Sequence, residues 1–189
     1  MKLYGSLNNR FEENKNYGDE IKVGTDITMY YWSDRHCYYV TRVINQKHIF
    51  VKPYEVCANQ DEEGGMGHQN WKYFKTVKEY NEYLLAHGLN GSVDTFENPE
   101  EEWQFRYGHW YQVNRYSRDT YDHVIAIATK DCKVNCDPDA ILKLARFYLR
   151  ELTDEEIEDI KNGKEIVKYQ KIKQGISFNI RDYYYDWEF

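Results

Sequence analysis

The densest group of chemically reactive side chains lies in one short stretch, Trp32-Ser33-Asp34-Arg35-His36-Cys37. In an enzyme, Asp34 and His36 would form an acid–base pair, with Cys37 as the nucleophile. Adjacent residues of an extended strand point to opposite faces, however, so His36 is poorly placed to activate Cys37. Serine and aspartate also build tight turns by bonding to the backbone. We therefore interpret the stretch as a structural turn and expect a protein that is not an enzyme.

A second reactive pair, Cys132 and Cys136, has a C-x₃-C spacing. A zinc site would need two further ligands, for which Cys57 with His123 or His68 are the candidates. A zinc site usually shows a second pair of closely spaced ligands, and the sequence contains no such second pair. We expect two reduced thiols here, with no metal and no cofactor.

Acidic side chains are concentrated in the middle of the chain. Residues 76–163 carry 10 basic and 18 acidic residues, a net charge of −8, whereas residues 1–75 have a net charge of 0 and residues 164–189 of +1. One interpretation is a negative face that binds a basic partner. The other is a solvated helix whose first turn carries acids that suit the helix dipole. The residues of the predicted face are Glu97, Glu100, Glu101, Glu102, Glu151, Asp154, Glu155, Glu156, Glu158 and Asp159.

The composition limits the classes of function that are reasonable. A net charge of −7 argues against a general nucleic-acid binder, which needs a basic surface to displace counterions. Aromatic residues make up 17% of the chain and include 19 Tyr, which suits either a protein interface or a tyrosine-rich sheet. The first residues lack the apolar core of a signal peptide, and no apolar run is long enough to span a membrane. We expect a cytoplasmic protein.

Residues 23–56 form the stretch around which the fold is organised. Three runs rich in β-branched and aromatic residues, 27–32, 37–44 and 48–56, are separated by short groups of turn-forming residues. This pattern predicts an antiparallel meander.

Further elements are indicated by capping signals and periodicity. Ser6 can begin a short N-terminal helix, and Thr76 and Thr153 each begin a capping box. A helix that starts at Asp137 and Pro138 carries a continuous apolar stripe, which predicts the best-buried helix of the chain. We also expect strands at residues 70–75, 103–107, 110–116, 123–129 and in the C-terminal segment.

The two ends of the chain carry a recurring set of residues: Gly5, Ser6, Asn9, Arg10, Val23, Gly24, Trp32, Ser33, Asp34, Arg35, His36, Arg181, Tyr184, Tyr185, Asp186 and Phe189. With these residues the chain resembles a set of small accessory proteins carried by phages and mobile elements of Gram-positive gut bacteria. The resemblance covers roughly the first 56 and the last 16 residues, and the chain departs from the pattern in its long middle and at Asn179-Ile180, where a glycine is usual. Some proteins from similar elements are anti-CRISPR proteins that block Cas9.

We therefore expect an α+β fold in three segments. Residues 1–75 supply an N-terminal helix and the meander, residues 76–163 an acidic α/β insertion, and residues 164–189 the strands that complete the sheet. The N- and C-terminal strands together would form an SH3-like small β-barrel or a bent antiparallel sheet.

The function that fits these features best is inhibition of a bacterial defence system by protein–protein binding in the host bacterial cytosol. The partner would be a basic host protein, most specifically a Cas9-type nuclease or its guide-RNA complex, bound by the acidic insertion. The first alternative is a nucleic-acid-binding module on an SH3-like barrel, with a groove lined by Arg35, Arg42, Lys52, Lys72 and Lys75 beside Trp32 and Trp71. The second is a small enzyme that uses Asp34, His36 and Cys37.

Overall fold

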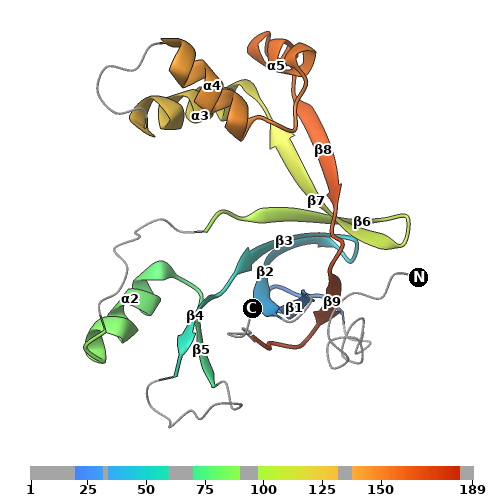
Figure 1. The fold of residues 1–189 in the computed structure, drawn as a ribbon. Helices are drawn as coiled ribbons and strands as arrows, with labels where there is room; N and C mark the ends of the chain where they lie inside the picture. The colour runs from blue at the N-terminus through green and yellow to red at the C-terminus, as the bar shows by residue number, and fades with distance from the viewer. Residues whose placement is uncertain (1–19, 32–33, 60–69, 90–97, 132–137, 184–189) are drawn as a thin grey trace. The chain divides into compact units, whose positions relative to one another are not determined.

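The computed structural model of the chain describes residues 20–31, 34–59, 70–89, 98–131 and 138–183. These residues contain four helices and a mostly antiparallel sheet, which confirms the predicted α+β class (Figure 1). The N-terminal helix predicted at Ser6 lies outside the described residues. In chain order the elements are β1 (Asp26–Tyr30), β2 (Arg35–Asn45), β3 (His48–Pro53), β4 (Glu55–Ala58), β5 (Trp71–Phe74), α2 (Val77–Ala86), β6 (Glu101–Arg106), β7 (His109–Tyr116), α3 (Arg118–Asp131), α4 (Pro138–Tyr148), α5 (Asp154–Lys161), β8 (Ile166–Lys171) and β9 (Gly175–Phe178).

The chain divides into two compact units, which are described separately. Residues 1–112 with 171–189 form the first unit, and residues 113–170 form the second. The segment 76–163, expected from the sequence as one insertion, contributes to both units, because α2 and β6 belong to the first and α3, α4 and α5 to the second. None of the helices in the described part of the chain has the length and apolarity that crossing a lipid bilayer requires.

The first unit is built on the predicted meander. Strand β2 pairs antiparallel with β1 and with β3, and β6 extends the sheet beyond β3. The C-terminal strand β9 pairs with β1, with Thr28 opposite Ser177, so a strand from the N-terminal segment and one from the C-terminal segment share the sheet as predicted. The third predicted run ends earlier than expected, at Pro53, because proline has no N–H for the ladder. The chain then leaves the sheet, and β4 and β5 form a separate hairpin.

The main core lies on one face of this sheet. Ile27, Val40, Ile49, Val51 and Trp103 are each fully buried there, and Ile176 and Phe178 of β9 complete the cluster. The Trp110 ring of β7 lies 5.4 Å from the Phe178 ring, so side chains from the two end strands of this unit's sheet meet across the core. The strand pairing nevertheless runs in the open order β7-β6-β3-β2-β1-β9, and the described strands do not close into a barrel.

Helix α2 begins at the predicted cap. The Thr76 hydroxyl accepts a hydrogen bond from the Glu79 backbone N–H at 3.2 Å. The Glu79 carboxylate accepts from the Lys75 N–H at 3.3 Å, one residue before the position that a capping box would use. Gly88 follows the helix with a φ of +69°, a backbone conformation that favours glycine.

In the second unit, the prediction of a strand at residues 123–129 is wrong, because these residues belong to helix α3. The β-branched run suggested a strand, but the Ser117 hydroxyl caps the helix by accepting from the Thr120 N–H at 3.4 Å. Tyr121 and Val124 then share a helix face that packs against the buried residues of the unit. Tertiary packing of this face outweighs the strand propensity of the sequence.

Helices α4 and α5 complete the second unit. The capping box at Thr153 is confirmed, with Glu156 as its reciprocal partner. Helix α4 begins at Pro138 as predicted, but it is not the best-buried helix, because Ala145 is its only buried residue in the described structure. Leu142 and Phe147 are 52% and 60% exposed. The apolar stripe of α4 is therefore only partly used in folding.

Candidate functional site

The reactive stretch at the start of β2 does not provide an activated thiol. Cys37 lies opposite Thr28 of β1, and its side chain is only 2% exposed. Burial, followed by the nearby carboxylate of Asp182, raises the pKa of Cys37 to about 12. The thiol is therefore protonated at neutral pH, whereas nucleophilic attack requires the thiolate.

His36 sits between two aromatic side chains. Its ring centroid lies 4.7 Å from that of Tyr31 and 5.7 Å from that of Tyr183. Burial lowers the pKa of His36, and the negative charge of Asp34 opposes this effect. A lowered pKa favours the neutral imidazole at pH 7, which packs as a ring. The geometry fits a structural role at the hairpin end; Trp32 and Ser33 lie outside the described residues.

The groove residues of the nucleic-acid alternative are occupied by internal contacts. Arg35 forms an ion pair with Asp182, and the Lys72 ammonium lies 4.5 Å from the Tyr83 ring centroid. The Trp71 ring meets the Tyr183 ring edge-on at 4.8 Å.

Two further groove residues lie on β2 and β3, and a third, Lys75, directly follows β5. Arg42 stacks on Phe50 at 3.6 Å and pairs with Glu100, Lys52 lies on β3, and Lys75 lies 5.2 Å from the Tyr39 ring. The described residues of the set are thus engaged in contacts within the first unit.

Only two of the predicted metal ligands, Cys57 and His123, lie in the described part of the chain. Cys132 and Cys136 lie outside the described residues, as does His68. Cys57 lies on β4 and is partly exposed, and His123 lies on α3 in the other unit. Within the described residues no group of three or more His, Cys, Asp or Glu side chains has a geometry that could hold a metal ion.

Three of the predicted acidic residues are part of the sheet of the first unit. Glu100 accepts from Thr41 at 2.6 Å and pairs with Arg42 at 3.1 Å. The Glu101 carboxylate accepts from the Trp103 indole at 2.9 Å, and burial raises the pKa of Glu101 while that hydrogen bond lowers it. The carboxylates of these residues are therefore used mainly in contacts within the first unit and are less available to a partner.

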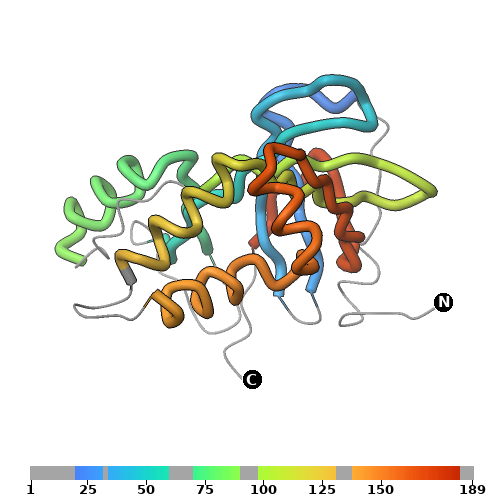
Figure 2. Tube along the Cα trace, turned by 90° about the horizontal axis from the view of Figure 1, so that it is seen from above, coloured from blue at the N-terminus to red at the C-terminus, as the bar shows by residue number. Residues whose placement is uncertain are grey.

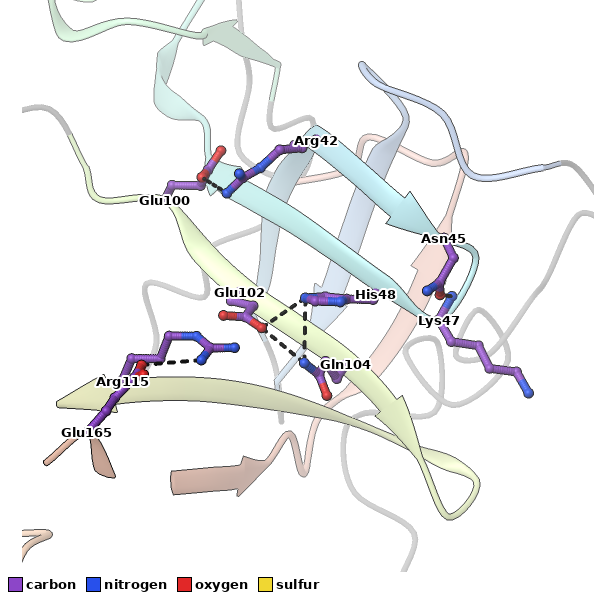
Figure 3. A network of polar contacts seen from close by, with 9 residues as sticks. All are labelled: Arg42, Asn45, Lys47, His48, Glu100, Glu102, Gln104, Arg115 and Glu165. Carbon is purple, nitrogen blue, oxygen red and sulfur yellow. Dashed lines mark hydrogen bonds and ion pairs between the residues drawn. The ribbon is translucent and has the colours of Figure 1, made fainter. Parts of the chain in front are cut away.

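Glu102 is the most deeply buried of the acidic set. Its side chain is 7% exposed, and its Oε1 atom lies 2.8 Å from His48 Nε2 and 3.0 Å from the Gln104 amide nitrogen (Figure 3). The register of β3 and β6 explains this arrangement, because His48 lies directly opposite Gln104 and one face of the pair carries all three side chains. Glu97 lies outside the described residues.

The remaining acidic residues lie within α5 or just before it, in the second unit. Asp154, Glu155 and Glu156 occupy its first turn, Glu158 and Asp159 follow, and Glu151 precedes the helix and accepts from Tyr116 at 3.0 Å. Several pair with cations of the same unit: Asp154 with Arg146, Glu156 with Lys168, Glu158 with Lys161 and Asp159 with Lys164.

The hydrogen bond from Lys168 lowers the pKa of Glu156. The predicted acidic set is therefore divided between the two units. Counted for residues 113–170, the second unit carries 10 basic and 12 acidic residues, a net charge of only −2.

A pocket opens between α3, α4 and α5, and it includes two of the predicted acidic residues. Its volume is about 250 Å³. Its apolar lining comes from side chains of all three helices and the turn after α4, and charged side chains from α4 and α5 complete it. The lining residues are Tyr121, Leu142, Ala145, Arg146, Leu149, Asp154, Ile157, Glu158 and Lys161.

Sequence reasoning found the acids of this pocket but missed its other residues. Arg146 ties the turn after α4 by donating to the carbonyls of Leu149 and Leu152 at 2.9 and 2.7 Å, and it also pairs with Asp154 at 3.3 Å. Leu142 belongs to the apolar stripe of α4, which the sequence predicts to be buried. Tyr121 lies just before the strand predicted at residues 123–129, and its spacing from Val124 is that of a helix face.

Comparisons with protein-family models, with curated proteins and with solved structures found no match for this chain. The functional argument therefore depends on the geometry of the two units.

Proposed function

We propose that this chain is a binding protein that inhibits a bacterial defence nuclease, as an accessory protein of a phage or mobile element acting in the host cytosol. The partner that we propose is a Cas9-type nuclease or its guide-RNA complex. The observation that carries the proposal is the pocket between α3, α4 and α5, which combines an apolar floor with exposed acidic side chains.

Part of the apolar surface at this pocket stays exposed to solvent in the folded protein. Leu142 lines the pocket at 52% exposure, beside the other apolar lining residues Tyr121, Leu149 and Ile157. Phe147 and Tyr148 of the same helix, which are 60% and 44% exposed, are not among the lining residues. Grouped apolar side chains with polar neighbours are typical of protein-binding surfaces. Anchors in such sites fill small pockets, and aromatic side chains and arginine are the most frequent among them.

The acidic part of the surface supports a basic partner. The Asp154 and Glu158 side chains are 92% and 64% exposed, so their ion pairs with Arg146 and Lys161 are in contact with solvent. Exposed ion pairs of this kind contribute about 0–1 kcal/mol, so lysines or arginines of a partner can replace them at low cost. Glu155, beside them in the first turn of α5, is also exposed.

Of the predicted acidic face, we propose that only the residues of the second unit contribute to binding. Glu100, Glu101 and Glu102 make contacts within the sheet, and we assign them a structural role. We propose no catalytic step, because Cys37 is buried with a raised pKa and His36 packs between rings. The bent sheet of the first unit is the part that we propose to be SH3-like.

The test is a DNA-cleavage assay with a purified Cas9–guide complex and increasing amounts of the protein. The test variant combines Asp154→Asn, Glu155→Gln and Glu158→Gln. The control variant combines Glu20→Gln, Glu82→Gln and Glu165→Gln, which removes the same charge from exposed carboxylates elsewhere.

We expect the natural sequence and the control to inhibit cleavage, and the test variant to lose inhibition while its circular-dichroism spectrum stays unchanged. Equal inhibition by all three proteins would contradict the proposed surface. Absence of inhibition by the natural sequence, across Cas9 proteins of Gram-positive gut bacteria, would contradict the proposed partner.

A further inference from the structure

The turn between β6 and β7 carries a residue that its backbone geometry disfavours. Tyr107 and Gly108 have φ values of +50° and +78°, as in the two-residue hairpin turns that prefer Asn-Gly or Asp-Gly. A bulky residue in the left-handed region is uncommon, and such strain often marks a functional position. Tyr107 is 86% exposed, so packing against the described residues does not account for it.

Other side chains of the hairpin extend this exposed surface. Trp110 packs against the core, and its ring lies 5.5 Å from that of Phe105. Strand residues alternate between faces, so Arg106, His109 and Tyr111 lie on the opposite face. The hairpin projects from the strands beside it in both views (Figure 1, Figure 2). Its end therefore presents Tyr107 with an arginine and a histidine at its sides.

Two lysines lie beside the same face. The Ile172 N–H donates to the Trp110 carbonyl at 3.0 Å, and the Ile172 side chain packs against the core. Its neighbours Lys171 and Lys173 are both exposed. Lys171 is the last residue of β8, so alternation directs it away from the core, towards the face that carries Tyr111, and Lys173 follows the end of that strand. A chain with a net charge of −7 thus has three cations near the exposed Tyr107 ring and the half-buried Tyr111 ring.

The acidic residues on this face of the sheet are already paired. Glu102 is buried against His48 and Gln104, and Glu100 pairs with Arg42 (Figure 3). Their negative charge is therefore partly compensated within the sheet. The cations nearer the hairpin end can then act on an approaching polyanion.

We infer that this surface, formed by Arg106, Tyr107, His109, Tyr111, Lys171 and Lys173, binds single-stranded nucleic acid. Unpaired bases stack on the exposed Tyr107 ring and against the half-buried Tyr111 ring, and the lysines and Arg106 meet the phosphates. A single strand is favoured over a duplex because a ring at a hairpin tip can stack only on bases that are not enclosed in a helix. None of its residues belongs to the predicted groove at Arg35, Lys72 and Lys75 or to the proposed protein-binding surface on α4 and α5.

The experiment is fluorescence anisotropy with fluorescein-labelled, mixed-sequence DNA and RNA strands of about 12 nucleotides, at about 50 mM and about 200 mM salt. Tyr107→Asn removes the ring and leaves a residue that tolerates the turn. We expect it to weaken binding at least about fivefold, with an unchanged or higher urea midpoint. Tyr107→Phe keeps the ring and should keep most of the affinity. Tyr148→Asn, an exposed tyrosine on α4, is the control and should bind normally.

Salt dependence separates stacking from phosphate contact. Replacing Lys171 and Lys173 by Gln should reduce the slope of log affinity against log salt by about 1.4, whereas Tyr107→Asn should leave that slope unchanged.

Three results would overturn the inference. The first is no binding by the natural sequence at the lower salt, and the second is equal binding by Tyr107→Asn and the natural sequence. The third is loss of nuclease inhibition by Tyr107→Asn without any oligonucleotide binding, which would assign the hairpin end to a protein contact.

Discussion

Arg35 at the start of β2 and Asp182, which follows β9, form an ion pair although 147 positions separate them in the sequence. The same segment is held by Thr28, a fully buried residue whose hydroxyl donates to the Ile180 carbonyl at 2.9 Å and accepts from the Asp182 N–H at 3.1 Å. The segment after β9 is therefore fixed to β1 and β2. The stretch that looked most reactive in the sequence supplies half of this junction.

The C-terminal segment is expected to be essential for the fold. Deleting residues 175–189 removes β9, exposes an edge of β1 and takes Ile176 and Phe178 out of the core. We expect the truncated protein to lose cooperative thermal unfolding, because pairing of sequence-distant strands is lost. A native-like unfolding transition, measured by circular dichroism, would show that the meander folds without its closing strand.

Glu102 should matter for stability and an acid of α5 should not. Glu102→Ala leaves His48 and Gln104 without their buried partner, so we expect a loss of about 1–3 kcal/mol in the free energy of unfolding. Glu155→Ala, at an exposed position, should change it by about 0.5 kcal/mol or less. Urea denaturation measures both. Equal effects would contradict the division of the acidic residues into structural and binding groups.

Stability should fall at alkaline pH. The pKa of Cys37 rises from 9.0 to about 12 on folding, so the unfolded chain releases this proton at a lower pH than the folded chain does. The stabilising contribution is complete below about pH 9 and is lost as the pH rises towards 12, with a slope of about 1.4 kcal/mol per pH unit for one group. Burial also raises the pKa values of Tyr38, Tyr54 and Tyr73, which adds loss of the same sign from about pH 10.

Urea midpoints between neutral pH and about pH 10 test this expectation, with Cys37→Ala as the diagnostic variant. That variant should be less stable at neutral pH, because a packed side chain is lost, and its stability should depend less on pH above about 9. The same pH dependence in Cys37→Ala and in the natural sequence would contradict the assignment.

Local sequence signals predicted much of the fold. The alternating runs of the meander and the capping residues at Thr76 and Thr153 depend on contacts within a few residues, and the structure has them as predicted. The strand predicted at residues 123–129 is wrong because Val124 packs, together with Tyr121, as a helix face, an outcome decided by tertiary contacts. The end of β3 at Pro53 could have been predicted from the sequence, because proline has no N–H to donate to the neighbouring strand.

The candidate site was less predictable. A count of charge along the chain identified Asp154 and Glu158, but it gave no sign that Glu102 would be buried against His48. That distinction depends on the register of β3 and β6, which no local pattern fixes. The exposure of Leu142 was also hidden, because an apolar stripe indicates which residues share a face and not whether that face is covered.

The most direct test of the central claim is the dissociation constant of this protein for a purified Cas9–guide complex, measured for the natural sequence and for the variant with Asp154→Asn, Glu155→Gln and Glu158→Gln. We predict that the variant binds at least about tenfold more weakly, and that the natural sequence loses affinity when salt rises from about 0.1 M to about 1 M. Equal dissociation constants for the two proteins, independent of salt, would contradict the account.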